Sequence, residues 1–261
     1  MKRPLLLLLL LLVAGCRRAE APPLPAVPAE TPITLTAPAA ITAGERLTII
    51  AALDAPPETR VTLILRNSYG PQIFQESVAA GQAVFVIVGE RTRQAGRLVV
   101  TAVAGAARAE TILTIRPGRA VSPVTPLVGA RSIIADGNHW ALVTVVPHDQ
   151  FGNPLATGTP VRFSTLHADG RRTEHSQPID HLLAWRRVWS GTVAGTTTIA
   201  TAVDGRFGPE KDLLEVPGWP QPFTLSVEPG DFIADGRQLV TVRTAPIVDA
   251  FGNVMPDGTH I

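Results

Sequence analysis

The stretch Gln94–Val103 reads QAGRLVVTAV and has an echo later in the chain. The echo is Val193-Ala194-Gly195 followed, two residues on, by Thr198–Val203, which reads TIATAV. The offset is 99 residues at the Ala-Gly pair and 100 at Thr-Ala-Val. Self-similarity at a fixed period indicates repeated structural units. Residues 33–117 and 120–217 are therefore predicted to be two copies of one domain.

Both copies are predicted to be all-β. Short runs rich in β-branched residues recur at roughly ten-residue spacing and are bounded by Gly, Pro, Asn and Asp, a pattern typical of a β-sandwich. Examples are Arg46–Ile50, Arg60–Leu65, Ala83–Val88 and Thr111–Ile115. The predicted architecture is a tandem of immunoglobulin-like β-sandwiches.

A second echo indicates an incomplete third repeat over residues 222–261. Ile134–Gly137 (IADG) recurs as Ile233–Gly236, and Asp149–Asn153 (DQFGN) recurs as Asp249–Asn253 (DAFGN). A sandwich of this kind has seven strands, and this segment supplies only two or three, too few to bury both faces or cover its edges. We therefore expect the chain to be a fragment of a longer protein. The alternatives are that the remnant packs on the second domain or is completed in trans.

The middle repeat resembles the bacterial immunoglobulin-like domains of intimin and invasin adhesins. The resemblance rests on Ala135-Asp136-Gly137, Asp149–Pro154 (DQFGNP) and Gly158–Phe163 (GTPVRF). It is weaker in the first repeat, where Thr42–Glu45 (TAGE) stands in for Ala-Asp-Gly and no Phe-Gly-Asn is present. The resemblance implies an immunoglobulin-like fold and a role in cell adhesion at the cell surface.

The N-terminus predicts export and lipid anchoring. Met1–Pro4 carries two positive charges, Leu5–Leu12 is a run of leucines, and Ala14-Gly15 precedes the only cysteine, Cys16. This is the pattern of a secretory signal, and its apolar run is too short to span a bilayer. The segment ending in Cys16 resembles a lipobox, which implies diacylglyceration of Cys16 and cleavage after residue 15; the alternative is an ordinary cleavage site. Residues 16–32, rich in Ala and Pro, are predicted to be a disordered tether.

Charge and cysteine content limit the partners. The chain has 23 Lys and Arg against 22 Asp and Glu. A nearly neutral protein without a basic cluster gives no indication of nucleic-acid binding. One cysteine excludes an internal disulfide, so core packing must hold the domains together.

No catalytic motif is present, and we predict no enzyme activity, cofactor or resident metal. His167, His175 and His181 lack the close paired spacing of a zinc site. Asp136, Asp149 and Asn153, with their repeats at 235, 249 and 253, offer oxygen ligands for calcium, but side chains of this type also cap their own turns, and we favour turn capping.

The predicted function is that of a membrane-anchored structural or adhesive spacer. The alternative is a module that binds carbohydrate or another envelope protein through exposed aromatic side chains, and the candidates are Tyr69, Trp140 and Trp219. For Trp219, packing in the linker is the competing interpretation. Trp185 is the predicted core tryptophan, because it shares strand parity with Leu183 and Trp189.

Overall fold

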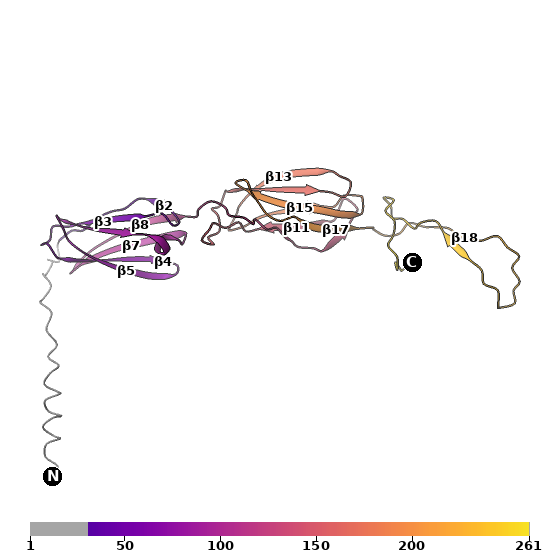
Figure 1. Cartoon of the computed structure of the whole chain (residues 1–261), viewed down its shortest axis with the longest axis horizontal. Helices are drawn as coiled ribbons and strands as arrows, with labels where there is room; N and C mark the ends of the chain where they lie inside the picture. The colour runs from indigo at the N-terminus through magenta and orange to yellow at the C-terminus, as the bar shows by residue number, and fades with distance from the viewer. Residues whose placement is uncertain (1–30, 261) are drawn as a thin grey trace, which may run out of the picture. The chain divides into compact units, whose positions relative to one another are not determined.

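A computed structural model describes residues 31–260 (Figure 1). The predicted signal peptide (1–15), the lipidation site Cys16 and most of the 16–32 tether lie outside these residues. The described chain forms two compact units. The smaller contains residues 31–39, 46–87 and 97–113, and the larger contains residues 40–45, 88–96 and 114–260. No helix among the described residues is long and apolar enough to cross a membrane.

The prediction of an all-β fold is confirmed, since within residues 31–260 strands and one short 3-10 helix, η1 (Gly89–Thr92), make up the regular structure. Residues 34–116 form a three-stranded sheet, β1-β3-β6, and a five-stranded sheet, β2-β8-β7-β4-β5. The strands are β1 (Thr34–Thr36), β2 (Ala40–Thr42), β3 (Leu47–Ala52), β4 (Arg60–Asn67), β5 (Gly70–Ser77), β6 (Gln82–Ile87), β7 (Gly96–Ala104) and β8 (Ala107–Arg116).

Residues 127–216 form the same arrangement again. One sheet has the order β14-β11-β9, and the other has the order β10-β17-β15-β12-β13, with β16 paired to β15. The strands are β9 (Leu127–Val128), β10 (Ser132–Ile134), β11 (Trp140–Val145), β12 (Pro160–Leu166), β13 (Arg172–Pro178), β14 (Ala184–Trp189), β15 (Gly195–Val203), β16 (Arg206–Phe207) and β17 (Lys211–Val216). Figure 1 shows the two sheets facing each other.

Both repeats begin with the same parallel pairing. Strand β2 runs parallel to β8, and β10 runs parallel to β17. In each case the next residue continues the contact: Ala43 N–H donates to Arg116 O, and Ala135 N–H donates to Val216 O, both at 2.8 Å. Ala43 and Ala135 are both buried. Thr42–Glu45 therefore occupies the position that Ala-Asp-Gly holds in the second repeat.

The core of the second sandwich follows strand alternation. In β11 the residues Ala141, Val143 and Val145 point inward and pack with Phe163 and Ile199 of the facing sheet. Burying these side chains contributes roughly 1.5–3 kcal/mol for each of the larger ones, an upper estimate because the unfolded chain already hides some surface.

The prediction that Trp185 is a core residue is wrong. The side chain is 51% exposed. The register of β14 on β11 pairs Ala184 with Val145 and Val188 with Ala141, so the small and β-branched residues of β14 face the core. Trp185 and Trp189 have the opposite parity. Sequence parity identified a common face, but only the pairing with β11 decided which face is buried.

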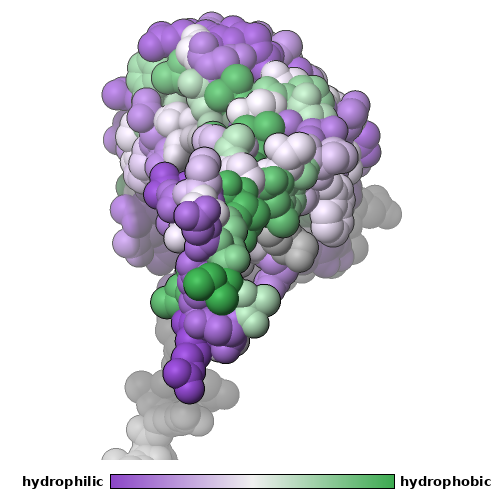
Figure 2. Space-filling model, turned by 90° about the vertical axis from the view of Figure 1, so that its right-hand side faces the viewer, coloured by the Kyte–Doolittle hydropathy of each residue, from purple (hydrophilic) through white to green (hydrophobic). Residues whose placement is uncertain are grey.

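Residues 222–260 carry little regular structure. Strands β18 (Leu225–Val227) and β19 (Val242–Thr244) form an antiparallel pair in which all six residues are exposed. A two-stranded ribbon of this kind has no second sheet on which to bury a face. Apolar residues such as Leu239 stay in contact with solvent, and Figure 2 shows hydrophobic side chains reaching the surface in this view.

Candidate functional site

The loop Asp149–Asn153 is organised around the buried carboxylate of Asp149. One carboxylate oxygen, Oδ1, accepts the backbone N–H groups of Phe151 (2.8 Å) and Asn153 (3.0 Å). The other, Oδ2, accepts the backbone N–H of Gly118 and the side-chain amide of Asn153, both at 2.8 Å. The carboxylate therefore closes its own turn and also ties it to the segment that precedes the second sandwich.

Asn153 extends this network to a third segment of the same compact unit, residues 88–96. Its Oδ1 accepts the backbone N–H of Ala95 at 2.9 Å, and its Nδ2 donates to the carbonyl of Arg93 at 2.7 Å. One amide side chain thus satisfies both a donor and an acceptor of a loop backbone almost sixty residues away. Paired backbone contacts of this kind fix both position and orientation.

The third repeat makes the same set of contacts. Asp249 accepts N–H groups from Phe251, Asn253 and Gly218, and Asn253 Nδ2 donates to Asp249 Oδ2 at 2.8 Å. Asn253 also accepts from Ala194 N–H at 2.7 Å and donates to the Thr192 carbonyl at 3.0 Å. Each partner is shifted by 99 or 100 residues from its counterpart. We call the contact of an Asp-x-Phe-Gly-Asn loop with these partners the loop clamp.

The two loop clamps differ at the phenylalanine. The Phe151 ring lies against Gly44, where an added Cβ would be 2.6 Å from Cζ, and the Arg93 guanidinium stacks on the ring at 5.4 Å. Phe251 is 50% exposed. The Phe151 ring is therefore more covered than the Phe251 ring.

The clamp lowers the pKa of both aspartates. Burial raises the pKa of each carboxyl. Hydrogen bonds from the asparagine side chain, the linker glycine and the loop backbone together lower it by more than burial raises it. The pKa of Asp149 falls below its ordinary value of 3.8, and that of Asp249 falls to about 2. The charged form of both aspartates is the one that the clamp stabilises.

The aspartates considered as calcium ligands accept backbone N–H groups of their own turns, whereas Asn153 and Asn253 contact distant loops. Asp136 accepts the backbone N–H groups of Asn138 (2.8 Å) and His139 (2.9 Å), and Asp149 and Asp249 accept N–H groups in their own loops. The sequence missed the contact with residues 93–95 and 192–194. The only sign of this contact in the sequence was that the partner segments, residues 93–95 and 192–194, recur at the same period as the loops.

His167 and His181 of the second repeat contact different partners in different places. His181 Nδ1 pairs with Asp180 at 2.7 Å on the surface, while His167 lies in the interior, 3.5 Å from Glu215. Among the described residues, His, Cys, Asp and Glu form no group of three that could hold a metal ion.

Glu215 holds the backbone next to the second loop clamp. This carboxylate is 1% exposed and accepts the Gly191 backbone N–H at 2.6 Å and the Thr197 hydroxyl. Gly191 directly precedes Thr192, whose carbonyl Asn253 contacts. In the first repeat the corresponding positions on β8 and β7 are Ile115 and Leu98, both buried. The second repeat therefore places a buried, hydrogen-bonded carboxyl group where the first has aliphatic core.

The outer face of the sheet β14-β11-β9 carries three of the four tryptophans of the chain. Trp140 pairs directly with Trp189 across the two strands, and Trp185 lies further along β14. The Arg187 guanidinium stacks on the Trp140 ring at 4.4 Å, and Leu142, the strand partner of Arg187, is also exposed. Trp and Arg are enriched among residues that dominate binding energy. We call this surface the tryptophan face.

The three residues predicted as ligand contacts lie on three different segments of the chain. Trp140 belongs to the tryptophan face. Tyr69 lies in the turn between β4 and β5 and is 77% exposed, and Trp219 lies in the linker after β17 and is 86% exposed. The exposure of Trp219 contradicts the competing interpretation that it packs in the linker. Sequence reasoning missed Trp185 and Trp189 as members of the face.

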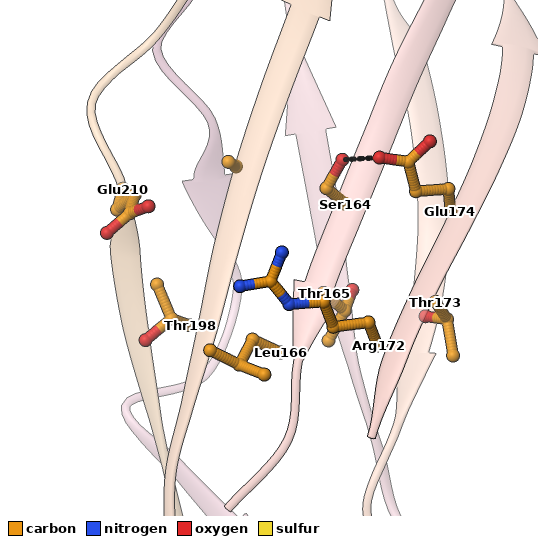
Figure 3. A pocket seen from close by; sticks show the side chains of 9 residues that line it. Ser164, Thr165, Leu166, Arg172, Thr173, Glu174, Thr198 and Glu210 are labelled. Carbon is orange, nitrogen blue, oxygen red and sulfur yellow. Dashed lines mark hydrogen bonds between the residues drawn. The ribbon is translucent and has the colours of Figure 1, made fainter. Parts of the chain in front are cut away.

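The facing sheet carries a polar hollow of about 340 Å³. Small side chains on β12 and β15, including Ser164 and Ala200, lie between longer ones on neighbouring segments. Figure 3 shows the Arg172 side chain reaching across the hollow and Ser164 bonded to Glu174. With Glu210 on the other side, the hollow holds one positive and two negative groups. It lacks the aromatic surface of the tryptophan face.

Comparison with known proteins supports the fold. No protein-family model and no curated protein sequence matches the chain. Among solved structures, invasin, a bacterial integrin-binding protein, aligns over 87% of this chain and 48% of its own, with 22% identity and a TM-score of 0.51. The fold is similar to that of invasin. A two-domain fibronectin type III segment of chicken tenascin aligns over 70% of this chain and 97% of its own, with 11% identity and a TM-score of 0.32. The chain spans about half the length of invasin. The fold of the described residues is that of immunoglobulin-like β-sandwiches.

Proposed function

We propose that this protein is an exported lipoprotein, held to the cell envelope through Cys16, whose immunoglobulin-like repeats act as a structural and adhesive spacer at the cell surface. No catalytic role is proposed. Invasin is described as an integrin-binding protein; we carry over only the general role of a surface adhesin, and no integrin contact.

The observation that carries the proposal is the loop clamp, made twice with the same atoms at a spacing of about one hundred residues. A contact that recurs with the repeat period links successive repeats in the same way each time. Nearest-neighbour contacts of this kind are how repeat proteins gain stability as they gain length. That is what a spacer requires.

The anchor is tested by expressing the whole chain in a bacterium that processes lipoproteins. Growth with labelled palmitate should label the wild-type chain, which should fractionate with membranes, and protease added to intact cells should cut it. Cys16→Ser should lose the label and leave the membrane fraction. Equal membrane association of both forms would contradict anchoring through Cys16.

The adhesive role is tested by comparing adherence to host cells of bacteria with and without the chain. Increased adherence that requires Cys16 supports the proposal. If bacteria expressing a surface-exposed wild-type chain adhere no better than those without it, the chain is a spacer without adhesive function.

A second candidate function is a module that binds carbohydrate or another envelope protein, and the tryptophan face is the observation that favours it. Large exposed aromatic patches on a folded domain are typical of binding surfaces. A glycan array probed with the full chain tests it. A hit that Trp140→Ala abolishes supports carbohydrate binding.

A further inference from the structure

The first repeat indicates that the fold itself does not require the tryptophan face. The buried pair Leu47 and Ile87 on β3 and β6 corresponds to the buried pair Ala141 and Val188 on β11 and β14. With these pairs aligned, the first repeat has valines where the second has two tryptophans and an arginine. The corresponding positions are Val84 and Trp185, Val86 and Arg187, and Val88 and Trp189. Core packing therefore does not explain the aromatic residues.

The tryptophan face also carries uncompensated positive charge. On this face Arg187 is stacked on Trp140. Arg186 has the inward parity of Ala184 and Val188, is half-buried and lines the adjoining hollow. Within residues 31–260 neither guanidinium forms an ion pair or a side-chain hydrogen bond. The nearby carboxylate, Asp180, already contacts His181. A ligand with negative charge would supply the acceptors that these arginines lack.

An open hollow of about 540 Å³ adjoins these residues. Trp185, Trp189 and both arginines line it, and Gln177 and Asp180 add polar groups at its edge. The volume lies within the range of sites that hold small ligands. Indole surfaces, two guanidinium groups and the amide of Gln177 therefore line one hollow, together with the carboxylate of Asp180, which pairs with His181.

We propose that the tryptophan face and the adjoining hollow bind an acidic glycan, a saccharide chain that carries carboxylates. The apolar faces of sugar rings stack on the indoles of Trp140 and Trp189. Arg187 on the face and Arg186, where it lines the hollow, pair with the carboxylates, for which the guanidinium fork is well matched. Gln177 contacts hydroxyl groups. This inference rests on the second candidate function and names its ligand class.

The test uses the full mature chain and an array of uronic-acid and sialic-acid oligosaccharides, each beside its methyl ester and a neutral oligosaccharide of equal length. Affinities of hits are measured by calorimetry at two salt concentrations. The acidic forms should bind at least tenfold more tightly than their methyl esters, and added salt should weaken binding, since exposed charges are screened.

Matched variants assign the binding to the face. Arg187→Gln should weaken the acidic ligand about tenfold and leave the methyl ester nearly unchanged. Trp189→Ala should weaken both about tenfold. Two controls should stay within twofold of wild type: Trp219→Ala, an exposed tryptophan elsewhere, and Arg162→Gln, an arginine stacked on Phe207 at 5.5 Å. Unchanged melting temperatures show that the variants fold.

The other outcomes distinguish a failure of this inference from a failure of the second candidate function. Tryptophan-dependent binding of neutral and acidic glycans with equal affinity would support carbohydrate binding and overturn the acidic class. Binding of polyglutamate without any glycan would overturn the glycan in favour of an acidic protein partner. If neither a glycan nor polyglutamate binds in a way that depends on Trp189, both this inference and the second candidate function are overturned.

Discussion

Replacing Asn153 with alanine should open the first loop clamp. The variant loses three side-chain hydrogen bonds, to Ala95 N–H, the Arg93 carbonyl and Asp149 Oδ2. Neutral bonds contribute about 0.5–1.5 kcal/mol each and a bond to a charged group about 1.5–3 kcal/mol. Because Asn153 is half-buried, water replaces part of this, and we expect a net loss of about 2 kcal/mol.

Hydrogen exchange measures this loss where it arises. A local opening free energy reduced by about 2 kcal/mol corresponds to roughly 30-fold faster exchange. The Ala95 amide, which donates to Asn153, should show this change. The Gly118 amide, which donates to Asp149, should change less because that carboxylate remains.

Asn138→Ala is the matched control, because Asn138 is exposed and its side chain contacts only the carbonyl of Asp136. It should leave Ala95 protection as in wild type. If Asn153→Ala changes the exchange of Ala95 by less than threefold, the hydrogen bonds of Asn153 do not hold the clamp, and the reasoning is refuted.

Three further predictions concern charge and shape at the two loop clamps. The folded-state pKa of Asp249 is about 2, below the ordinary 3.8. Its contribution to folding stability, roughly 1–2 kcal/mol, is therefore present above pH 4 and is lost as the pH falls toward 2. Acid titration followed by hydrogen exchange should show this loss, and Asp249→Asn should remove the pH dependence. Glu215→Gln should lower the free energy of unfolding by about 1–3 kcal/mol in urea denaturation, since one buried donor loses its acceptor; a loss below 0.5 kcal/mol, on the order of an ordinary surface substitution, would contradict this role. Gly44→Ala should destabilise the protein by about 1 kcal/mol more than Gly137→Ala, because both have positive φ but only the first adds a clash, with the Phe151 ring; equal melting temperatures would count against that contact.

Much of the fold could be predicted from the sequence because strand signals are local. Alternation of β-branched residues, glycine turns and a period near one hundred residues indicated all-β repeats, and Asp149 and Asn153 were recognised as turn formers. These features depend on neighbours a few residues apart. The second echo likewise located Asp249 and Asn253.

The inward face of β14 was beyond the sequence. Trp185 and Ala184 lie on opposite sides of one strand, and Trp185 was expected inside because it shares strand parity with Leu183 and Trp189. Pairing with β11 placed Ala184 opposite Val145 in the core and left Trp185 in solvent. Register between strands forty residues apart is a long-range property, and a shift of one residue exchanges the two faces.

By itself, then, the sequence determined the strand content, the repeat and the two sets of recurring residues, one around Ala95 and Ala194, the other around Asn153 and Asn253. Only the tertiary structure revealed that each set binds the other. The reason is physical: the period arises along the chain, whereas the hydrogen bonds of Asn153 span almost sixty residues and form only when the chain has folded to bring both loops together.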